Sequence, residues 1–207
     1  MVRQVPRPRL YDDALRSRLL ICATEAIASG GVDALSVRAV AAAAGTSTNA
    51  IYTLFGGRDG LVDAVVATVG ASFLAEQVAV PRTADARGDL LELGRAYRRW
   101  ALAHPEMYAV MFGGRVHLPE LAPGKMDGSE EAIRPLFELA ARAHEAAGPS
   151  ARPVEPAVLA MSIWGVVHGA VMLELTALAG QPDTWRSALY ERQMEMMGEF
   201  WFGPSER

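Results

Sequence analysis

Short polar side chains interrupt two apolar runs near the N-terminus of this 207-residue chain. The stretch AAAAGTSTNAIYTLF contains Gly45, Thr46, Ser47, Thr48 and Asn49 in succession. Such residues form turns and cap helices, because their side chains compete for backbone hydrogen bonds. They also suit DNA recognition: an asparagine amide pairs with adenine, and a threonine offers its hydroxyl to phosphate or its methyl group to thymine. The stretch therefore predicts a turn between two short helices, with polar side chains available for base contacts.

The elements around this stretch are predicted to cross at a steep angle. Ser36 is suited to start a helix over residues 37–44, which Gly45 ends, and a second helix is predicted over residues 47–55. Two helices joined by so short a turn cannot lie parallel, and this is the geometry of a helix-turn-helix motif. Ile51 is the apolar residue expected to anchor the second helix in the core.

Eight residues of this region are the predicted DNA contacts. The N-terminal end of a recognition helix lies in the major groove, where its side chains reach base edges. Tyr52 is long enough to donate to a phosphate, and Arg58 begins the next helix, whose N-terminus also attracts phosphate. Ser47 is equally suited to capping the second helix. The predicted contacts are Arg38, Thr46, Ser47, Thr48, Asn49, Tyr52, Thr53 and Arg58.

Charge is distributed unevenly along the chain. The net charge is -4, but the residues up to Gly60 carry +2 and the remainder carries -6. A basic head on an acidic body is typical of a DNA-binding protein, although codon composition explains arginine usage equally well, since Lys125 is the only lysine. Residues 1–10 are predicted to form a flexible arm in preference to a minor-groove contact through its arginines.

Composition argues against a membrane protein, a metal protein and an enzyme. No run approaches the roughly 18 apolar residues of a membrane helix, and no signal-peptide core follows the basic N-terminus. We therefore expect a cytoplasmic protein. Cys22 is the only cysteine, so neither a disulfide within the chain nor a cysteine-held zinc site can form. Because common catalytic motifs are missing, we predict no catalytic residue, no metal and no cofactor.

Apolar residues recur at intervals of three and four along the chain, with glycine and proline at the breaks, which predicts an all-α fold. A three-helix head is predicted over residues 1–66, joined to a larger helical effector-binding and dimerisation body over residues 67–207. The other predicted helices cover residues 11–29, 59–78, 90–103, 107–112, 130–147, 157–179 and 185–201, with a loop over 113–128.

Residues 15–66 resemble the DNA-binding domain of the TetR (tetracycline repressor) family of bacterial regulators. The resemblance rests on the runs ATEAIASGGVDALSVRAVAAAAGTS and IYTLFGGRDGLVDAV. The second run is similar to the family pattern of Tyr-x-x-Phe, two spacers, a basic residue, an acidic residue and leucine, here Tyr52, Phe55, Arg58, Asp59 and Leu61. It departs from the family at two positions, because Arg58 replaces the usual lysine and Leu54 replaces a frequent histidine.

This resemblance implies a transcriptional regulator that binds an operator and responds to a small molecule. We expect a repressor that binds palindromic double-stranded DNA as a homodimer, with half-sites about 34 Å apart or a multiple of it. Two alternatives remain open: an activator of the same fold, and a helical interaction protein without sequence-specific DNA binding.

The body contains two runs, YRRWALAHPEMYAVMFGG and SIWGVVHGAVMLEL, which resemble a TetR subclass with a Trp and His-Gly pattern at Trp164, His168 and Gly169. Aromatic and methionine side chains with one histidine are suited to a small, mostly apolar effector, and each is also suited to a plain core. The predicted effector residues are Tyr97, Trp100, His104, Tyr108, Met111, Phe112, Trp164, His168 and Met172.

Dimerisation is expected to use the last two helices of the body. Gly165 and Gly169 form a ridge of small residues that lets another helix approach, and the final helix has more apolar surface than a terminal helix should expose. Two such helices from each chain would form a four-helix interface. The predicted interface residues are Gly165, Gly169, Trp185, Leu189, Met196 and Phe200.

Overall fold

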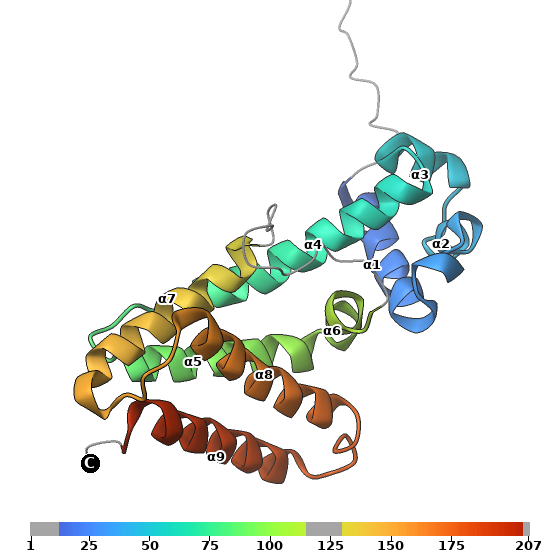
Figure 1. Ribbon diagram of the computed structural model, residues 1–207. Coiled ribbons are helices and arrows are strands. Elements are labelled where there is room, and N and C mark those ends of the chain that lie inside the picture. Colours follow the sequence, from blue (N-terminus) through green and yellow to red (C-terminus); the bar gives the residue numbers. More distant parts are fainter. Residues whose placement is uncertain (1–12, 115–129, 205–207) are drawn as a thin grey trace, which may run out of the picture. The chain divides into compact units, whose positions relative to one another are not determined.

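The structure is a computed structural model that describes residues 13–114 and 130–204. Every regular element in these two ranges is helical (Figure 1), which confirms the predicted all-α class. The elements are α1 (Asp13–Gly30), η1 (Val32–Ala34), α2 (Val37–Ala43), α3 (Thr48–Phe55), α4 (Arg58–Val78), α5 (Ala86–Ala103), α6 (Pro105–Phe112), α7 (Glu130–Ala147), η2 (Gly148–Ser150), α8 (Pro156–Leu175) and α9 (Asp183–Phe202).

The described residues group into two compact units. Residues 13–71 and 106–114 form the first, and residues 72–105 and 130–204 form the second. Helix α6 thus clusters with the N-terminal helices, although the sequence suggested a simple division after residue 66. The predicted arm over residues 1–10 and most of the predicted loop over residues 113–128 lie outside the described residues.

The core of the first unit comes from apolar residues spaced three or four apart, which share one face of each helix. Burying one such leucine, isoleucine or valine side chain stabilises the fold by about 1.5–3 kcal/mol. At most 2% of each of these residues is exposed: Leu19, Ala23, Ile27, Val40, Ala41, Ala50, Ile51, Leu61, Val65 and Val69.

Local hydrogen bonds and two glycines fix the ends of α2 and α3. The hydroxyl of Ser36 accepts from the backbone N–H of Ala39 at 3.3 Å, which confirms the predicted cap of α2. Gly45 has φ 69° and Gly56 has φ 78°, a left-handed conformation in which glycine lacks the Cβ penalty of other residues. The turn is closed further by the N–H of Thr46, which donates to the carbonyl of Ala41 at 2.9 Å.

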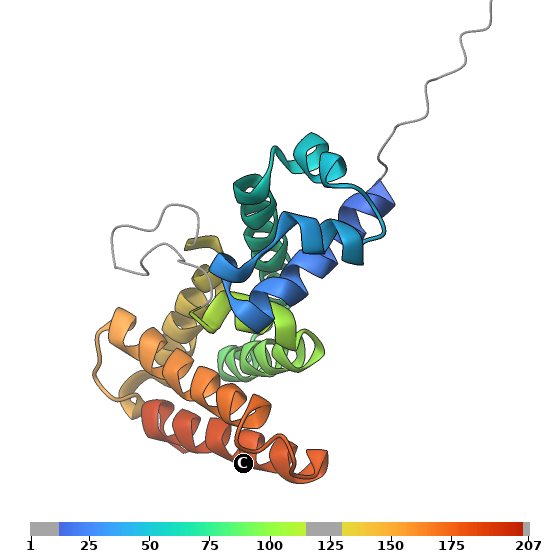
Figure 2. The ribbon, with the colours of Figure 1, turned by 90° about the vertical axis from the view of Figure 1, so that its right-hand side faces the viewer.

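The second unit is built from α5, α7, α8 and α9, which all pack on one another; α8 and α9 lie side by side in two perpendicular views (Figure 2). Its core includes Leu93, Leu139, Leu159, Ile163 and Met194, each at most 3% exposed. The buried hydroxyl of Tyr190 donates to the carbonyl of Gly94 at 2.6 Å. Because a Cβ on Gly94 would lie 3.3 Å from this hydroxyl, glycine allows α9 to approach α5 closely.

A buried ion pair joins three helices of this unit. Arg98 on α5 donates from Nε and Nη2 to the two carboxylate oxygens of Glu174 on α8, at 2.7 and 2.8 Å. Nη2 also donates to the hydroxyl of Ser187 on α9 at 3.0 Å. Only 2% of Glu174 is exposed, and its hydrogen bonds raise the pKa of Arg98. The pair therefore holds α5, α8 and α9 together through charges that are largely removed from water.

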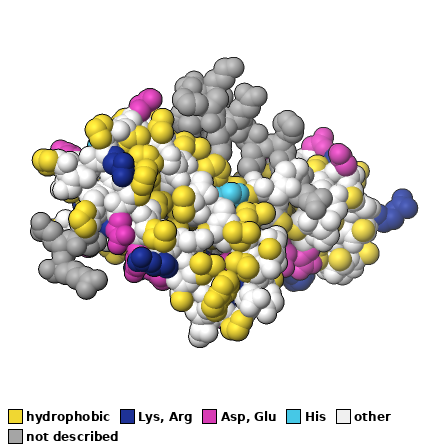
Figure 3. Space-filling model, turned by 60° about the horizontal axis from the view of Figure 1, so that its bottom comes forward, with side chains coloured by type: hydrophobic (Ala, Val, Ile, Leu, Met, Phe, Trp, Pro, Cys, Tyr) yellow, Lys and Arg dark blue, Asp and Glu magenta, His cyan; other side chains and the backbone are white. Residues whose placement is uncertain are grey.

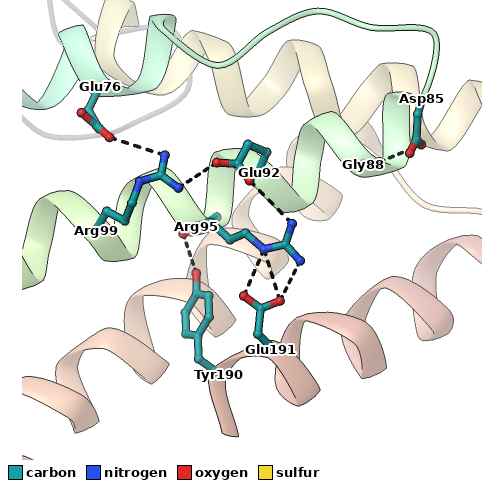
Figure 4. Close-up of polar contacts among 9 residues, drawn as sticks. Glu76, Asp85, Gly88, Glu92, Arg95, Arg99, Tyr190 and Glu191 are labelled. Carbon is teal, nitrogen blue, oxygen red and sulfur yellow. Dashed lines mark hydrogen bonds and ion pairs between the residues drawn. The ribbon is translucent and has the colours of Figure 1, made fainter. Parts of the chain in front are cut away.

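A second chain of charges lies in a more exposed part of the same unit (Figure 4). Arg95 donates to both carboxylate oxygens of Glu191 on α9, from Nε at 3.0 Å and from Nη2 at 2.8 Å. Arg99 pairs with Glu92 at 2.7 Å and with Glu76 at the end of α4 at 3.5 Å. The hydrogen bond from Arg95 lowers the pKa of Glu191, so this carboxylate stays ionised under mildly acidic conditions.

Two predicted helix limits differ from the structure by four residues, and the others differ by at most two. Helix α5 begins at Ala86 and not at residue 90, because Asp85 caps it by accepting from the N–H of Gly88 at 2.8 Å. Helix α8 ends at Leu175 and not at residue 179. The apolar pattern continues past Leu175, but Thr176 has non-helical backbone angles and its hydroxyl bonds back to the carbonyl of Met172.

Helices α4 and α8 are long and apolar enough to cross a membrane by length and composition alone, with mean hydropathies of 1.5 and 1.7. Core helices of soluble proteins meet the same criterion. The buried carboxylate of Glu174 on α8, paired with Arg98, identifies α8 as a helix of a packed bundle.

Candidate DNA-binding surface and aromatic cluster

The two faces of α3 differ sharply in exposure. Ala50 and Ile51 are fully buried, whereas Asn49, Tyr52 and Thr53 are exposed on the opposite side of the helix. Tyr52 is 60% exposed, a large fraction for an aromatic side chain. Four of the other predicted contacts lie close by in the chain: Arg38 and Ser47 are exposed, and Thr46 and Thr48 are half-buried.

Ser47 occupies the N-cap position of α3, but its side chain makes no capping hydrogen bond. The hydroxyl of Ser47 therefore does not accept from a backbone N–H in the first turn of α3, as a capping role would require. The backbone carbonyl of Ser47 accepts instead from the N–H of Ala50 at 3.1 Å. The exposed hydroxyl is available for a contact outside the chain.

The phenol of Tyr52 is positioned by the link between α3 and α4. A Cβ on Gly57 would lie 3.4 Å from the Tyr52 ring, and Gly57 has φ 131°, a conformation that L side chains rarely adopt. The ring thus lies over a backbone without a side chain, and the rest of Tyr52 remains exposed. This support limits the orientations of the phenol.

Arg58 lies differently from the other predicted contacts. Its guanidinium donates from Nε to the carbonyl of Leu35 at 3.3 Å and from Nη2 to the carbonyl of Val32. Nη1 lies 3.6 Å from the carboxylate of Asp59. The side chain is thus directed at backbone oxygens that precede α2.

The second unit contains six of the predicted effector residues, which we call the aromatic cluster: Tyr97, Trp100, His104, Trp164, His168 and Met172. The hydroxyl of Tyr97 and Nδ1 of His168 are 2.9 Å apart, and the rings of Trp164 and His168 have centroids 5.2 Å apart. Phe73 of α4 packs edge-on against Tyr97 at 5.4 Å and Trp100 at 5.0 Å. Burial lowers the pKa of His168, so its imidazole is neutral at pH 7.

Three predicted effector residues, Tyr108, Met111 and Phe112, belong to the first unit. Tyr108 is buried, and its ring centroid lies 4.9 Å from that of Phe112.

A hollow of about 230 Å³ near the start of α5 offers no convincing site, because its arginine is already engaged. Arg142 donates to Asp89 at 3.1 Å and to the carbonyl of Thr83 at 2.7 Å. The hollow is open and is lined by Ala84, Ala86, Arg142, Glu145 and Ala146.

Comparison with protein families assigns one known domain to each end of the chain. Residues 19–65 match the model described as bacterial regulatory proteins, tetR family, and residues 90–197 match the model of the tetracyclin repressor-like, C-terminal domain. The chain belongs to the TetR family. It therefore has an N-terminal helix-turn-helix domain for DNA and a C-terminal ligand-binding domain. No curated protein matches the chain.

Solved structures are similar to this TetR-family chain over most of its length. A protein of unknown function from Rhodococcus sp. RHA1 is 25% identical, with 95% of this chain and 100% of that chain covered and a TM-score of 0.67. A TetR family transcription regulator from Marinobacter aquaeolei VT8 is 20% identical, with 92% and 96% covered and a TM-score of 0.70. The fatty acid degradation regulator FadR from Bacillus halodurans is 15% identical, with 88% and 97% covered and a TM-score of 0.68. The latter two likenesses establish the fold.

Sequence reasoning missed Gln77, a polar residue in the second unit of this TetR-family protein. Only 4% of Gln77 is exposed, and its Nε2 has no hydrogen-bond partner. It lies one helical turn after Phe73 on α4, next to Glu76, which pairs with Arg99 of α5. A glutamine on the face of α4 that carries Phe73 and Val69 was the available sequence signal.

Proposed function

We propose that this protein is a ligand-responsive repressor that binds a palindromic operator as a homodimer in the cytoplasm and is released by a small, mostly apolar effector. The arrangement of α3 carries the DNA-binding part of the proposal. Because Ala50 and Ile51 anchor the helix, the exposed Asn49, Tyr52 and Thr53 can meet DNA without disturbing the core. Asparagine suits an adenine edge, and tyrosine and threonine suit phosphate.

The exposed faces of α8 and α9 support the dimer. Figure 3 views the molecule from the side that carries α9 in Figure 1, and hydrophobic side chains gather across the middle of that view. Gly165 and Gly169 have nothing within 4 Å of a Cβ position, so a partner helix can approach α8 closely. The exposed large apolar residues of the two helices are Val158, Met161, Val166, Leu173, Trp185, Met196 and Phe200.

The aromatic cluster supports an apolar effector with one polar anchor. Tyr97 and Trp100 are buried, while Trp164, His168 and Met172 are half-buried. A neutral imidazole held by the hydroxyl of Tyr97 favours an uncharged hydrogen-bonding group over a strongly charged one. Release requires that the effector bind one arrangement of the two DNA-binding domains better than the other, since only differential affinity shifts such an equilibrium.

Selection of bound DNA from a randomised pool tests the DNA-binding proposal. The purified protein is compared with Tyr52→Ala and Asn49→Ala, and with Glu155→Ala, an exposed substitution in the second unit, as the control. We expect a palindromic sequence to be enriched by the unchanged protein and the control and lost in the two α3 variants. If no sequence is enriched at low salt, the helical interaction protein becomes the better interpretation.

Three further measurements test the dimer, the repressor role and the effector. Light scattering should give about twice the 22.2 kDa of one chain, and a monomer at micromolar concentration would contradict the dimer. Transcription in vitro from a promoter that contains the selected operator should fall when the protein is added; a rise would identify an activator. In a thermal-shift screen, stabilisation by highly charged metabolites alone would contradict the apolar effector.

A further inference from the structure

The guanidinium of Arg58 uses all three of its nitrogens within the first unit. Nε and Nη2 donate to the carbonyls of Leu35 and Val32, and Nη1 lies 3.6 Å from the carboxylate of Asp59. The side chain is 38% exposed, whereas the carboxylate beside it is 95% exposed. A phosphate approaching Arg58 would meet this negative charge and would have to compete for donors that already have partners.

The two carbonyls lie at the point where the helix-turn-helix segment begins. Val32 is the first residue of η1, and Leu35, which follows η1, immediately precedes Ser36, the N-cap of α2. Arg58 is the first residue of α4 and follows the two-residue link Gly56–Gly57 that ends α3. Contacts between residue 58 and residues 32 and 35 therefore close the chain into a loop that contains both α2 and α3.

We propose that Arg58 is a positioning residue, which holds α3 at the angle that the operator requires and does not itself bind phosphate. This inference rests on the proposed DNA-binding function. The two carbonyls are on separate residues, and the fork of a guanidinium reaches both at once. A lysine ammonium is a compact point charge without this fork. Arg58→Lys therefore keeps the charge but cannot donate to both carbonyls in the same way.

The test measures the binding of the full chain to its selected operator and to an unrelated duplex over a range of salt concentrations. The variants are Arg58→Lys, Arg58→Gln and Arg38→Gln, the last being the same charge removal at an exposed arginine of α2. A phosphate contact that is lost reduces the slope of log K against log salt by about 0.9 and weakens binding to both duplexes. A misplaced recognition helix weakens binding to the operator alone.

We expect Arg58→Lys and Arg58→Gln to weaken operator binding by about tenfold or more, which corresponds to the loss of a hydrogen bond to a charged group. The salt slope and the binding to the unrelated duplex should be unchanged. Arg38→Gln should reduce the salt slope. If Arg58→Lys binds the operator as the unchanged protein does, or if Arg58→Gln behaves as Arg38→Gln does, the inference is overturned. Failure of the unchanged protein to select any operator would instead reject the proposed function.

Amide hydrogen exchange separates this role from a loss of global stability. In Arg58→Lys, residues 36–57 should exchange faster than in the unchanged protein, while α8 exchanges at the same rate. Equal exchange over residues 36–57 in both proteins would show that the hydrogen bonds of Arg58 do not hold α2 and α3 in place. This result would overturn the inference even if DNA binding were weakened.

Discussion

A Cβ atom on Gly60 would lie 1.9 Å from the backbone carbonyl oxygen of Phe55. The first turn of α4 therefore packs directly on the end of α3, and any side chain at position 60 would force the two helices apart. Exchange of glycine for alanine inside a helix ordinarily stabilises it by about 1 kcal/mol. At position 60 the contact with rigid backbone reverses that expectation.

We predict that Gly60→Ala destabilises the first unit by about 1–3 kcal/mol, the range of an overpacked core. Urea unfolding followed by circular dichroism measures the change. Gly70→Ala is the matched control, because Gly70 lies on the same helix with nothing within 4 Å of its Cβ position, and this variant should be slightly more stable. Equal stabilisation by both substitutions would contradict the predicted contact.

The open glycine ridge on α8 leads to a prediction about the dimer. Gly165→Leu should raise the dissociation constant of the dimer at least about tenfold, because a large side chain would prevent the close approach of the partner helix. Analytical ultracentrifugation measures this constant. Ala141→Leu, at an exposed position of α7, should leave it unchanged. A dimer of undiminished affinity in Gly165→Leu would place the interface elsewhere.

The ion pairs of the second unit should differ greatly in their contribution to stability. Glu174→Gln should lower the free energy of unfolding by about 3 kcal/mol, since it leaves the largely buried Arg98 with only the more exposed carboxylate of Asp183, at 3.8 Å, as a counter-ion. Glu191→Gln should cost less than about 1 kcal/mol, because both partners of that pair are more than 40% exposed. Chemical denaturation of the two variants tests this order, and similar losses would disagree with it.

His168 should make the stability of the protein depend on pH. Its pKa in the folded state is lowered by burial, so the unfolded chain binds the proton more readily, and stability falls as the pH drops through about 6.5. We predict a lower melting temperature at pH 5.5 than at pH 7.5. His168→Gln should flatten this dependence, whereas His144→Gln, which leaves His168 in place, should not. An unchanged profile in His168→Gln would assign the effect to other groups.

Gln77 should lower the stability of the free protein. A buried amide without a partner carries a desolvation penalty of about 1–3 kcal/mol. Gln77→Met, which keeps the length of the side chain, is predicted to raise the free energy of unfolding within that range. A decrease would mean that the amide is satisfied in solution, for example by a bound water molecule.

Spacing and caps predicted most of the helices, because both depend on neighbouring residues. The limits of α7 agree with the prediction, and Ser36 caps α2 as expected. The end of α8 was missed because Leu178 and Ala179 continue the apolar pattern, whereas the N–H of Leu178 donates to the carbonyl of Leu173 at 2.8 Å, five residues back, in a turn that ends the helix. Such a turn is not visible in periodicity.

Side-chain direction was the least predictable property of the candidate sites. The sequence identifies Arg58 as a charge beside the recognition helix, but the nearby carbonyls of Val32 and Leu35 come from residues more than 20 positions away. The close contact at Gly60 and the grouping of Tyr108 with the first unit likewise depend on tertiary packing. Residue types thus indicated where the sites lie in the sequence, and tertiary packing determines which atoms are available there.

The recognition helix is bracketed by glycines at positions 45 and 56 and is fixed to the core by Ala50 and Ile51. Its exposed positions, such as Thr53, therefore contribute little to the hydrophobic core. Under the proposed function, mutations at these positions can change the preferred base sequence over evolutionary time while the protein keeps its shape and its stability. New regulatory targets can then arise after gene duplication through a few substitutions, without a compensating change in the body.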